Sequence, residues 1–260
     1  MALHPILRGW IVPIMRLAVL SDIHGNLSAL RAVLDDIARQ NVDQIVNLGD
    51  SFSGPLDAAG TADLLAELNL PTVRGNHDRL LVDRPKSEMG NWEAWVIDEI
   101  TPATLDWCRT MPLTQEVDGI LLCHGTPQAD DENWLDQRGS NARLIPRDLD
   151  EVRKRAEGVT HQLTLCGHTH TARSVRLPDG RRIVNPGSVG CPAYLDTRME
   201  PHFIHQTGAP DARYAIVEAR GEDVGVALLS VPYDATEMIQ RARDKGGESW
   251  AHALETGWWA

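Results

Sequence analysis

The sequence is poor in cysteine and has no long uninterrupted hydrophobic run. Its four cysteines form no Cys-x-x-Cys pair and are too sparse for the disulfide framework of a small secreted domain. They are Cys108, Cys123, Cys166 and Cys191. The apolar N-terminal stretch is interrupted by proline and arginine, and no small-residue cleavage site follows it, so we predict neither a signal peptide nor a membrane span. We therefore expect a reduced, cytoplasmic protein.

Basic side chains are also in the minority. The chain has 25 Lys and Arg against 37 Asp and Glu, which gives a formal net charge of −12. A field of this sign repels polyphosphates and anionic lipids, so we expect no stable nucleic-acid binding and no membrane binding. A small anionic substrate is compatible with this charge only if a local positive site binds it.

Length and composition predict one sizeable domain. A chain of 260 residues with 42% hydrophobic content can bury a core without disulfides or oligomerisation. We place the domain at residues 16–235, after an N-terminal extension at 1–15 and before a C-terminal helix or tail at 236–260. Met15 is an alternative start of the chain, and the oligomeric state is left open.

Short apolar runs alternate with amphipathic stretches through the first part of the chain. The runs predict strands at 16–21 and 44–50 and another from residue 72, and the stretches predict helices at 27–39 and 57–68. This alternation predicts a largely parallel sheet. Further apolar runs predict strands within 119–125 and 161–170, and a polar segment predicts a surface helix at about 147–157. A Pro-Asp-Gly turn predicts a hairpin at 174–188, and 212–219 with 224–234 predict another.

Residues 79–115 have a different character. Tryptophans and aliphatic residues recur there at helical intervals, which predicts a helical insertion. The insertion can form a lid or a base-stacking wall over a ligand, or it can pack against the sheet as a pair of amphipathic helices. Aromatic residues at helical spacing usually belong to the core, which favours packing.

Polar side chains that can bind metals or carry protons follow the predicted strands where each strand ends. They are Asp22, His24, Asp50, Asn76, His77, His124, His168 and His170. In open α/β sheets, ligands bind beyond the carboxyl ends of the strands, so we expect these groups to meet in one place. Five of the ten histidines lie at these ends, which argues against a chance distribution.

These residues form a series of motifs that resembles a known family. In order and spacing, the series resembles the calcineurin-like metallophosphoesterases, and the segments LSDIHGNLSAL and IVNPGSVG are most similar to the small bacterial phosphoesterases of that superfamily. The motifs are Asp22-Ile23-His24, Gly49-Asp50, Gly75-Asn76-His77-Asp78, His124-Gly125 and Gly167-His168-Thr169-His170. The resemblance covers about residues 16–235 and implies an α/β fold, a sandwich of two mixed β-sheets flanked by helices.

The resemblance also implies two divalent metal ions. The family's roles place one ion on Asp22, His24 and His170 and the second on Asn76, His124 and His168, with Asp50 between the two. Carboxylate, imidazole and carboxamide ligands without thiolate favour Mn or Fe, with Zn, Ni or Co as alternatives. Cys123 and Cys166 lie next to ligands on predicted strands and should point to the opposite face, so we interpret them as packing residues.

The same resemblance implies a mechanism. Two metal ions activate a bridging hydroxide that attacks phosphorus directly, without a covalent enzyme intermediate. His77 is the candidate general acid, because it adjoins Asn76 and is not a family ligand, and Asp78 can orient its ring and raise its pKa. Asn76 and His77 are the expected substrate contacts. The alternative for His77 is a purely structural role, in which the imidazole only makes hydrogen bonds at the end of a strand.

The expected substrate is a small phosphodiester or phosphomonoester. Protein Ser/Thr phosphatases carry an arginine soon after Gly-Asp and a glutamate after Asn-His, whereas this chain reads GDSFSGP and GNHD. An alternative is a hydrolase of dinucleoside polyphosphates or pyrophosphates. A non-catalytic scaffold of the same fold is disfavoured, because every ligand position is filled. No arginine that binds phosphate is identified from the sequence.

Overall fold

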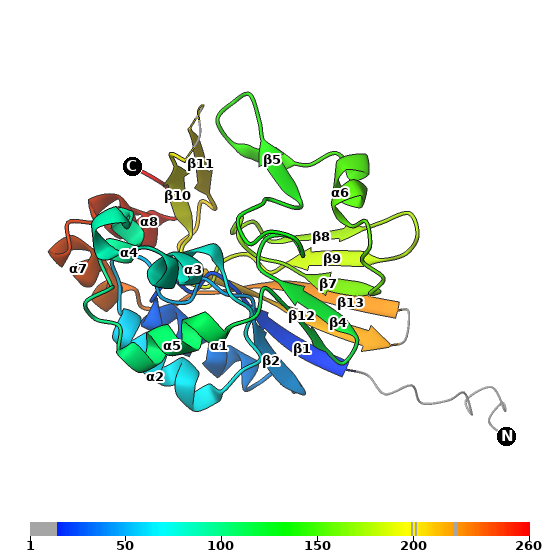
Figure 1. Cartoon of the computed structure of the whole chain (residues 1–260), viewed down its shortest axis with the longest axis horizontal. Coiled ribbons are helices and arrows are strands. Elements are labelled where there is room, and N and C mark those ends of the chain that lie inside the picture. Colours follow the sequence, from blue (N-terminus) through cyan, green and yellow to red (C-terminus); the bar gives the residue numbers. More distant parts are fainter. Residues whose placement is uncertain (1–14, 199, 201, 221–222) are drawn as a thin grey trace, which may run out of the picture.

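The computed structural model describes residues 15–198, 200, 202–220 and 223–260. The predicted extension at 1–15 lies outside the described residues except for Met15, which begins strand β1 (Met15–Leu20). Two mixed β-sheets form the centre of the molecule, and helices pack around them (Figure 1). The predicted sandwich is confirmed.

The first sheet has the strand order β13-β12-β1-β2. Strand β1 runs parallel to β2 (Gln44–Asn47) and antiparallel to β12 (Ala212–Arg220). Strand β12 forms the predicted hairpin with β13 (Asp223–Val231). Helix α1 (Leu27–Ile37) contacts β12, so this sheet is covered by a helix on one face.

The second sheet has the order β3-β4-β7-β9-β8. Its inner strands β4 (Ile120–Cys123), β7 (Leu163–Leu165) and β9 (Arg182–Asn185) are parallel, and its edge strands β3 (Thr114–Val117) and β8 (Arg173–Arg176) are antiparallel to their neighbours. The inner strands are parallel as predicted, and the hairpin predicted at 174–188 is confirmed as β8 and β9. Strand β3 was not predicted. The short turns that join β3 to β4 and β8 to β9 can only connect antiparallel strands.

Alternate residues of β1 belong to two different cores. Leu17 and Val19 pack between the sheets together with Leu165. Ala18 and Leu20 face the other way and join the core beneath α1. Since successive side chains of a strand point to opposite faces, a strand covered on both sides must be apolar throughout.

The predicted strand from residue 72 is reduced to a single bridge. Thr72 pairs with Asn47 in parallel, and no strand forms there. Pro71 precedes the bridge without a backbone N–H, and helix α3 begins only four residues beyond the bridge, at Asn76. The chain therefore lacks the length for a longer strand.

The insertion is helical, as predicted. It is built from short helices that run on into strand β3, and its Trp95 and Trp107 pack against the core. The helices between β2 and β3 are α2 (Ala58–Leu68), α3 (Asn76–Asp83), the 3-10 turn η2 (Lys86–Glu88), α4 (Asn91–Ala94) and α5 (Pro102–Thr110).

The C-terminal segment forms two helices where one helix or a tail was expected. Helix α7 (Thr236–Asp244) and helix α8 (Glu248–Thr256) are separated at Gly246, whose φ of 74° ends the first helix. Helix α8 contacts the hairpin of β10 (Ala193–Asp196) and β11 (Phe203–Gln206), and the hairpin stands beside it in Figure 1.

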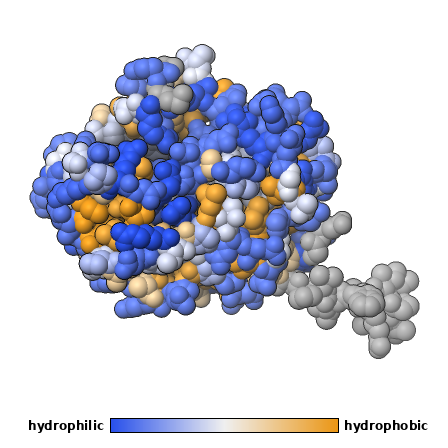
Figure 2. Space-filling view, in the orientation of Figure 1, coloured by the Kyte–Doolittle hydropathy of each residue, from blue (hydrophilic) through white to orange (hydrophobic). Residues whose placement is uncertain are grey.

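The remaining elements lie on the side of the second sheet. They are β5 (Asp136–Arg138), β6 (Leu144–Pro146) and α6 (Leu149–Arg155), the last of which confirms the predicted surface helix. Figure 2 shows a mainly hydrophilic face, with apolar side chains gathered near α4 and α5. Among the residues described, no helix has the length and apolar character needed to cross a membrane.

Candidate metal centre

The turns that follow β1, β2, β4 and β7 meet at one end of the sandwich. The N–H of Asp22 donates to the carbonyl of Gly49 (3.0 Å) and the N–H of Gly167 donates to the carbonyl of His124 (2.6 Å). The N–H of His168 donates to Asp22 Oδ2 (3.1 Å) and so joins the two sheets. These bonds place side chains from four separate strand ends next to one another.

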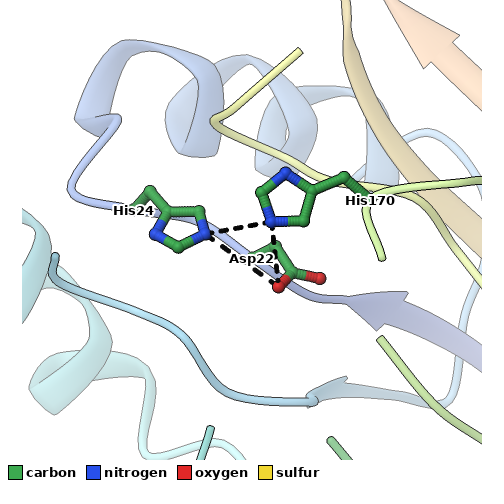
Figure 3. A group of neighbouring side chains, drawn as sticks. All are labelled: Asp22, His24 and His170. Atoms are coloured by element: carbon green, nitrogen blue, oxygen red, sulfur yellow. Dashed lines mark hydrogen bonds and ion pairs between the residues drawn. The ribbon is translucent and has the colours of Figure 1, made fainter. Parts of the chain in front are cut away.

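Asp22, His24 and His170 form the first group of potential ligands. Their side chains are buried and converge on one point (Figure 3). Nε2 of His24 lies 3.2 Å from Nε2 of His170, which lies 3.3 Å from Asp22 Oδ1. The structure thus brings together the three residues predicted to hold the first metal.

The hydrogen bonds of Nδ1 in His24 and His170 determine what their Nε2 atoms can bind. Nδ1 of His170 faces the carbonyl of Cys191 (3.0 Å), and Nδ1 of His24 faces the carbonyl of Ser53 (3.2 Å). A carbonyl only accepts, so each Nδ1 donates, and a ring that carries only this proton directs its Nε2 lone pair at the carboxylate of Asp22. Acceptors that face one another require a positive charge between them. A carboxylate with two imidazoles is a donor set that suits a divalent transition metal.

Asp50, His124 and His168 form the second group. Nε2 of His124 lies 3.1 Å from Asp50 Oδ2, and Nδ1 of His124 faces the carbonyl of Leu48 at 2.7 Å. Nε2 of His124 also lies 3.8 Å from Asp22 Oδ1, so the two groups adjoin. The predicted bridging role of Asp50 is consistent with this position and stays a prediction.

Four buried polar atoms of the centre have no hydrogen-bond partner among the described residues. They are Asp22 Oδ1, Asn76 Oδ1, His124 Nε2 and His168 Nε2. Buried polar atoms are nearly always paired in folded proteins, so four unpaired ones in one place indicate ligand atoms. The buried, unpaired atoms therefore fit the predicted pair of cations, and the predicted place of Asn76 in the second group stays a prediction.

Burial and charge act in opposite directions on these histidines. Burial lowers the pKa of His24 to about 3 and the pKa of His168 well below its ordinary value, so both rings are neutral and can offer lone pairs. Burial also opposes protonation of His124, but the carboxylates of Asp50 and Asp22 outweigh it and raise its pKa to about 10. Without metal, His124 therefore holds a proton at neutral pH.

We expect metal affinity to fall as pH falls, because a cation must displace that proton from His124. Below a pKa of about 10, each displaced proton weakens the apparent affinity by roughly tenfold per pH unit. Titration calorimetry in buffers of different ionisation enthalpy measures both the affinity and the proton release. An affinity that does not change between pH 6 and pH 9, with no proton released on binding, contradicts the expectation. His161→Gln, a change outside the centre, should keep the wild-type slope.

The backbone of the centre is in an unusual conformation. Asp22, His24, Asp50, His168 and His170 have φ values between 51° and 69°. Side chains other than glycine rarely adopt this left-handed conformation, which costs on the order of 1 to 3 kcal/mol for each residue. Strain concentrated at five potential ligands indicates that the surrounding fold holds them for a function.

Asp78 does not contact His77. Its carboxylate accepts the backbone N–H groups of Asp50 (2.8 Å), Ser51 (3.0 Å) and Gly75 (3.1 Å). Burial and the Asp50 charge raise the pKa of Asp78 to about 6. The predicted orienting role of Asp78 is therefore wrong. As the third residue of helix α3, its side chain turns back to the N-terminal N–H groups and holds the turn that carries Asp50.

Glu93 takes the place that was expected for Asp78. Its carboxylate bonds Nδ1 of His77, and only 2% of Glu93 is exposed. Burial opposes the charge of His77, but Asp50 and Glu93 together raise its pKa above the ordinary value. The ring of Trp92 stacks on His77 at a centroid distance of 4.8 Å and meets Trp250 of α8 edge-on.

The insertion and the C-terminal helices therefore form part of the site wall. Trp92 differs in this respect from Trp95, which packs in the core as predicted. No motif marks Glu93 or Trp92 in the sequence, and only their helical spacing from other aromatic residues is visible there. Cys123 and Cys166 are buried in an apolar cluster, which confirms that they are packing residues.

Comparisons with known proteins agree with this geometry. Residues 15–220 match a sequence-family model described as a calcineurin-like phosphoesterase superfamily domain. The crystal structure of a metallophosphoesterase from Sphaerobacter thermophilus is 25% identical, covers 95% of this chain and 100% of its own, and has a TM-score of 0.69. A hypothetical protein from Pyrococcus horikoshii OT3 is 17% identical with the same coverage and a TM-score of 0.72.

One curated relative matches over most of its length. An uncharacterized protein of Methanocaldococcus jannaschii is 27% identical over 248 residues, which are 86% of this chain and 90% of the relative. The family match spans well over half of the chain, and it includes both groups of potential ligands. This chain therefore belongs to the calcineurin-like phosphoesterase superfamily.

Proposed function

We propose that this protein is a dinuclear metal-dependent phosphoesterase that hydrolyses a small phosphodiester or phosphomonoester. The observation that carries the proposal is the pair of adjoining, buried ligand groups with unpaired donor atoms. Mn and Fe are the favoured ions, with Zn, Ni and Co as alternatives. The four cysteines are buried and unpaired, which suits a reducing cytoplasm.

When bound, two divalent cations supply an activated water nucleophile and stabilise charge on the attacking and leaving oxygens. The protein's own residues then position the substrate and handle the proton. The leaving oxygen of the ester needs a proton, and His77 is the group that can donate it. Because Nδ1 of His77 is directed at Glu93, the proton is donated from Nε2.

Glu93 and Trp92 keep His77 in place for this step. The carboxylate of Glu93 selects the ring orientation, and the stacked indole of Trp92 prevents the ring from turning away. The carboxylates of Asp50 and Glu93 raise the pKa of His77 against the effect of burial, so more of the ring carries its proton near neutral pH than in an unperturbed histidine. A general acid has to be protonated before it can act.

The proposal is tested by loading the metal-free protein with Mn, Fe, Co, Ni or Zn separately. Each form is assayed with p-nitrophenyl phosphate, bis-p-nitrophenyl phosphate, nucleotides and dinucleoside polyphosphates, and we expect turnover of an aryl ester with at least one metal. Product analysis separates cleavage of P–O–C from cleavage of P–O–P bonds. Stoichiometric metal binding without hydrolysis of any substrate would refute the proposal and favour a scaffold.

A further inference from the structure

The β10–β11 hairpin brings a charged group to the mouth of the metal centre. The ring of Tyr194 on β10 meets the ring of His170 at a centroid distance of 4.8 Å, and it also meets Trp92. Asp196 is two residues further along the same strand, so it lies on the same face, about 7 Å nearer the hairpin tip. Asp196 is 4% exposed and bonds the side chain of Arg198.

Asp196 holds the guanidinium of Arg198 in a fixed orientation. The carboxylate accepts Nη2 (2.7 Å) and Nε (3.1 Å) of Arg198 together with its backbone N–H (2.9 Å). The side chain of Arg198 is nevertheless 51% exposed. In the part of the chain that the structure describes, its Nη1 has no partner. The Nε and Nη2 edge of the guanidinium is therefore anchored on Asp196, and Nη1 is available to another group.

Arg181 is anchored by an aspartate two residues earlier, as Arg198 is, but its Nη1 also has partners in the protein. Asp179 accepts its backbone N–H (3.1 Å), Nε (2.9 Å) and Nη2 (2.7 Å), as Asp196 does for Arg198. The Nη1 of Arg181 donates to the carbonyls of Ala156 and Val159, so its whole fork serves the fold. Arg181 uses all of its guanidinium nitrogens within the protein, whereas Arg198, among the residues described, does not. The unpaired Nη1 of Arg198 therefore suits a bound ligand.

The hairpin that carries Arg198 packs against the metal centre. Tyr194 of β10 meets His170 of the first ligand group and Trp92 of the site wall. Asp196, which anchors Arg198, lies on the same face of this strand as Tyr194. The unpaired edge of Arg198 is therefore carried at the rim of the centre.

We propose that Arg198 binds the non-bridging oxygens of the reacting phosphoryl group and selects a dianionic substrate, a phosphomonoester or a terminal phosphate, over a diester. This inference rests on the proposed function. Arg138 also approaches Asp196, at 3.4 Å, so this carboxylate contacts two guanidinium groups. A guanidinium fork binds two oxygens of a phosphate at once, and a dianion benefits from it more than a monoanion.

The test uses the metal-loaded protein, inorganic phosphate and the variants Arg198→Ala and Arg198→Lys. Calorimetry should show phosphate affinity weakened by about 10- to 100-fold in Arg198→Ala, the range expected for charged hydrogen bonds, with metal content unchanged. KM for p-nitrophenyl phosphate should rise by a similar factor, and KM for bis-p-nitrophenyl phosphate by less than about threefold. Arg198→Lys should recover only part of the affinity, because an ammonium lacks the fork. Arg153→Ala, which removes an exposed charge from α6, should behave as wild type.

Three outcomes overturn this inference. They are unchanged phosphate affinity in both Arg198 variants, equal losses on the two esters, and full recovery by lysine. If Arg198→Ala loses metal or unfolds, Arg198→Lys tests the inference by the same phosphate affinity and the same KM values for the two esters. Hydrolysis of both esters with unaffected Arg198 variants refutes this inference alone. Phosphate binding that depends on Arg198 without hydrolysis of either ester refutes the proposed function alone.

Discussion

Asp50→Asn should lower turnover by at least ~10³-fold and remove metal from the second ligand group. The asparagine keeps an oxygen that can accept the N–H of His77, a bond of 2.8 Å in the wild type, so the turn should fold normally. What is lost is the negative charge 3.1 Å from Nε2 of His124 and, by the prediction, between two cations. Loss of a metal ion removes several kcal/mol of transition-state stabilisation, and each ~1.4 kcal/mol is a factor of ten in rate.

Metal content by mass spectrometry and turnover of an aryl ester check this prediction together. Asp63→Asn removes the same charge from the exposed face of α2 and should retain both metal and activity. An Asp50→Asn protein that keeps two metals per chain and wild-type turnover would show that Asp50 is not a ligand. Circular dichroism confirms that any loss is not a loss of fold.

His77→Asn should lower turnover by roughly 10²- to 10⁴-fold and leave metal content unchanged, the range typical of general acid catalysis. The loss should be larger for phenyl phosphate than for p-nitrophenyl phosphate, because phenoxide is the poorer leaving group and needs the proton more. Equal losses on the two esters, or a matching loss of metal, would remove the role of proton donor from His77.

Glu93→Gln tests whether that role depends on the buried carboxylate. Asp50 and Glu93 raise the pKa of His77 against burial, so without Glu93 the pKa falls. The protonated ring is the active form, so the alkaline limb of the pH profile for kcat should move to lower pH, with metal content unchanged. A profile that keeps its alkaline limb would leave Glu93 a purely structural role. Glu116→Gln, which loses a surface pairing with His161, is the matched control.

The sequence predicted the fold and the strand ends at which the polar side chains meet, because both depend on local patterns. Period-two and helical spacings of apolar residues reflect which faces are buried, and they place most elements correctly. The potential ligands follow strands directly. Once a strand is placed in the sheet, Asp22 or His124 must lie at the end of the sandwich where that strand ends. The errors arose where a local pattern allows two arrangements, as at residue 72, where the expected strand is reduced to a single bridge before helix α3 begins.

The tertiary structure alone decided the surroundings of the proposed acid. Asp78 is adjacent to His77 in sequence but turns to backbone N–H groups, while Glu93, sixteen residues further along, reaches the ring because the insertion folds back over the site. The hairpin that carries Arg198 is distant in the chain and meets the centre through Tyr194. Ligands near a strand end are determined by the strand itself, whereas the groups that orient a proton or an anion depend on packing between remote segments, which no local pattern records.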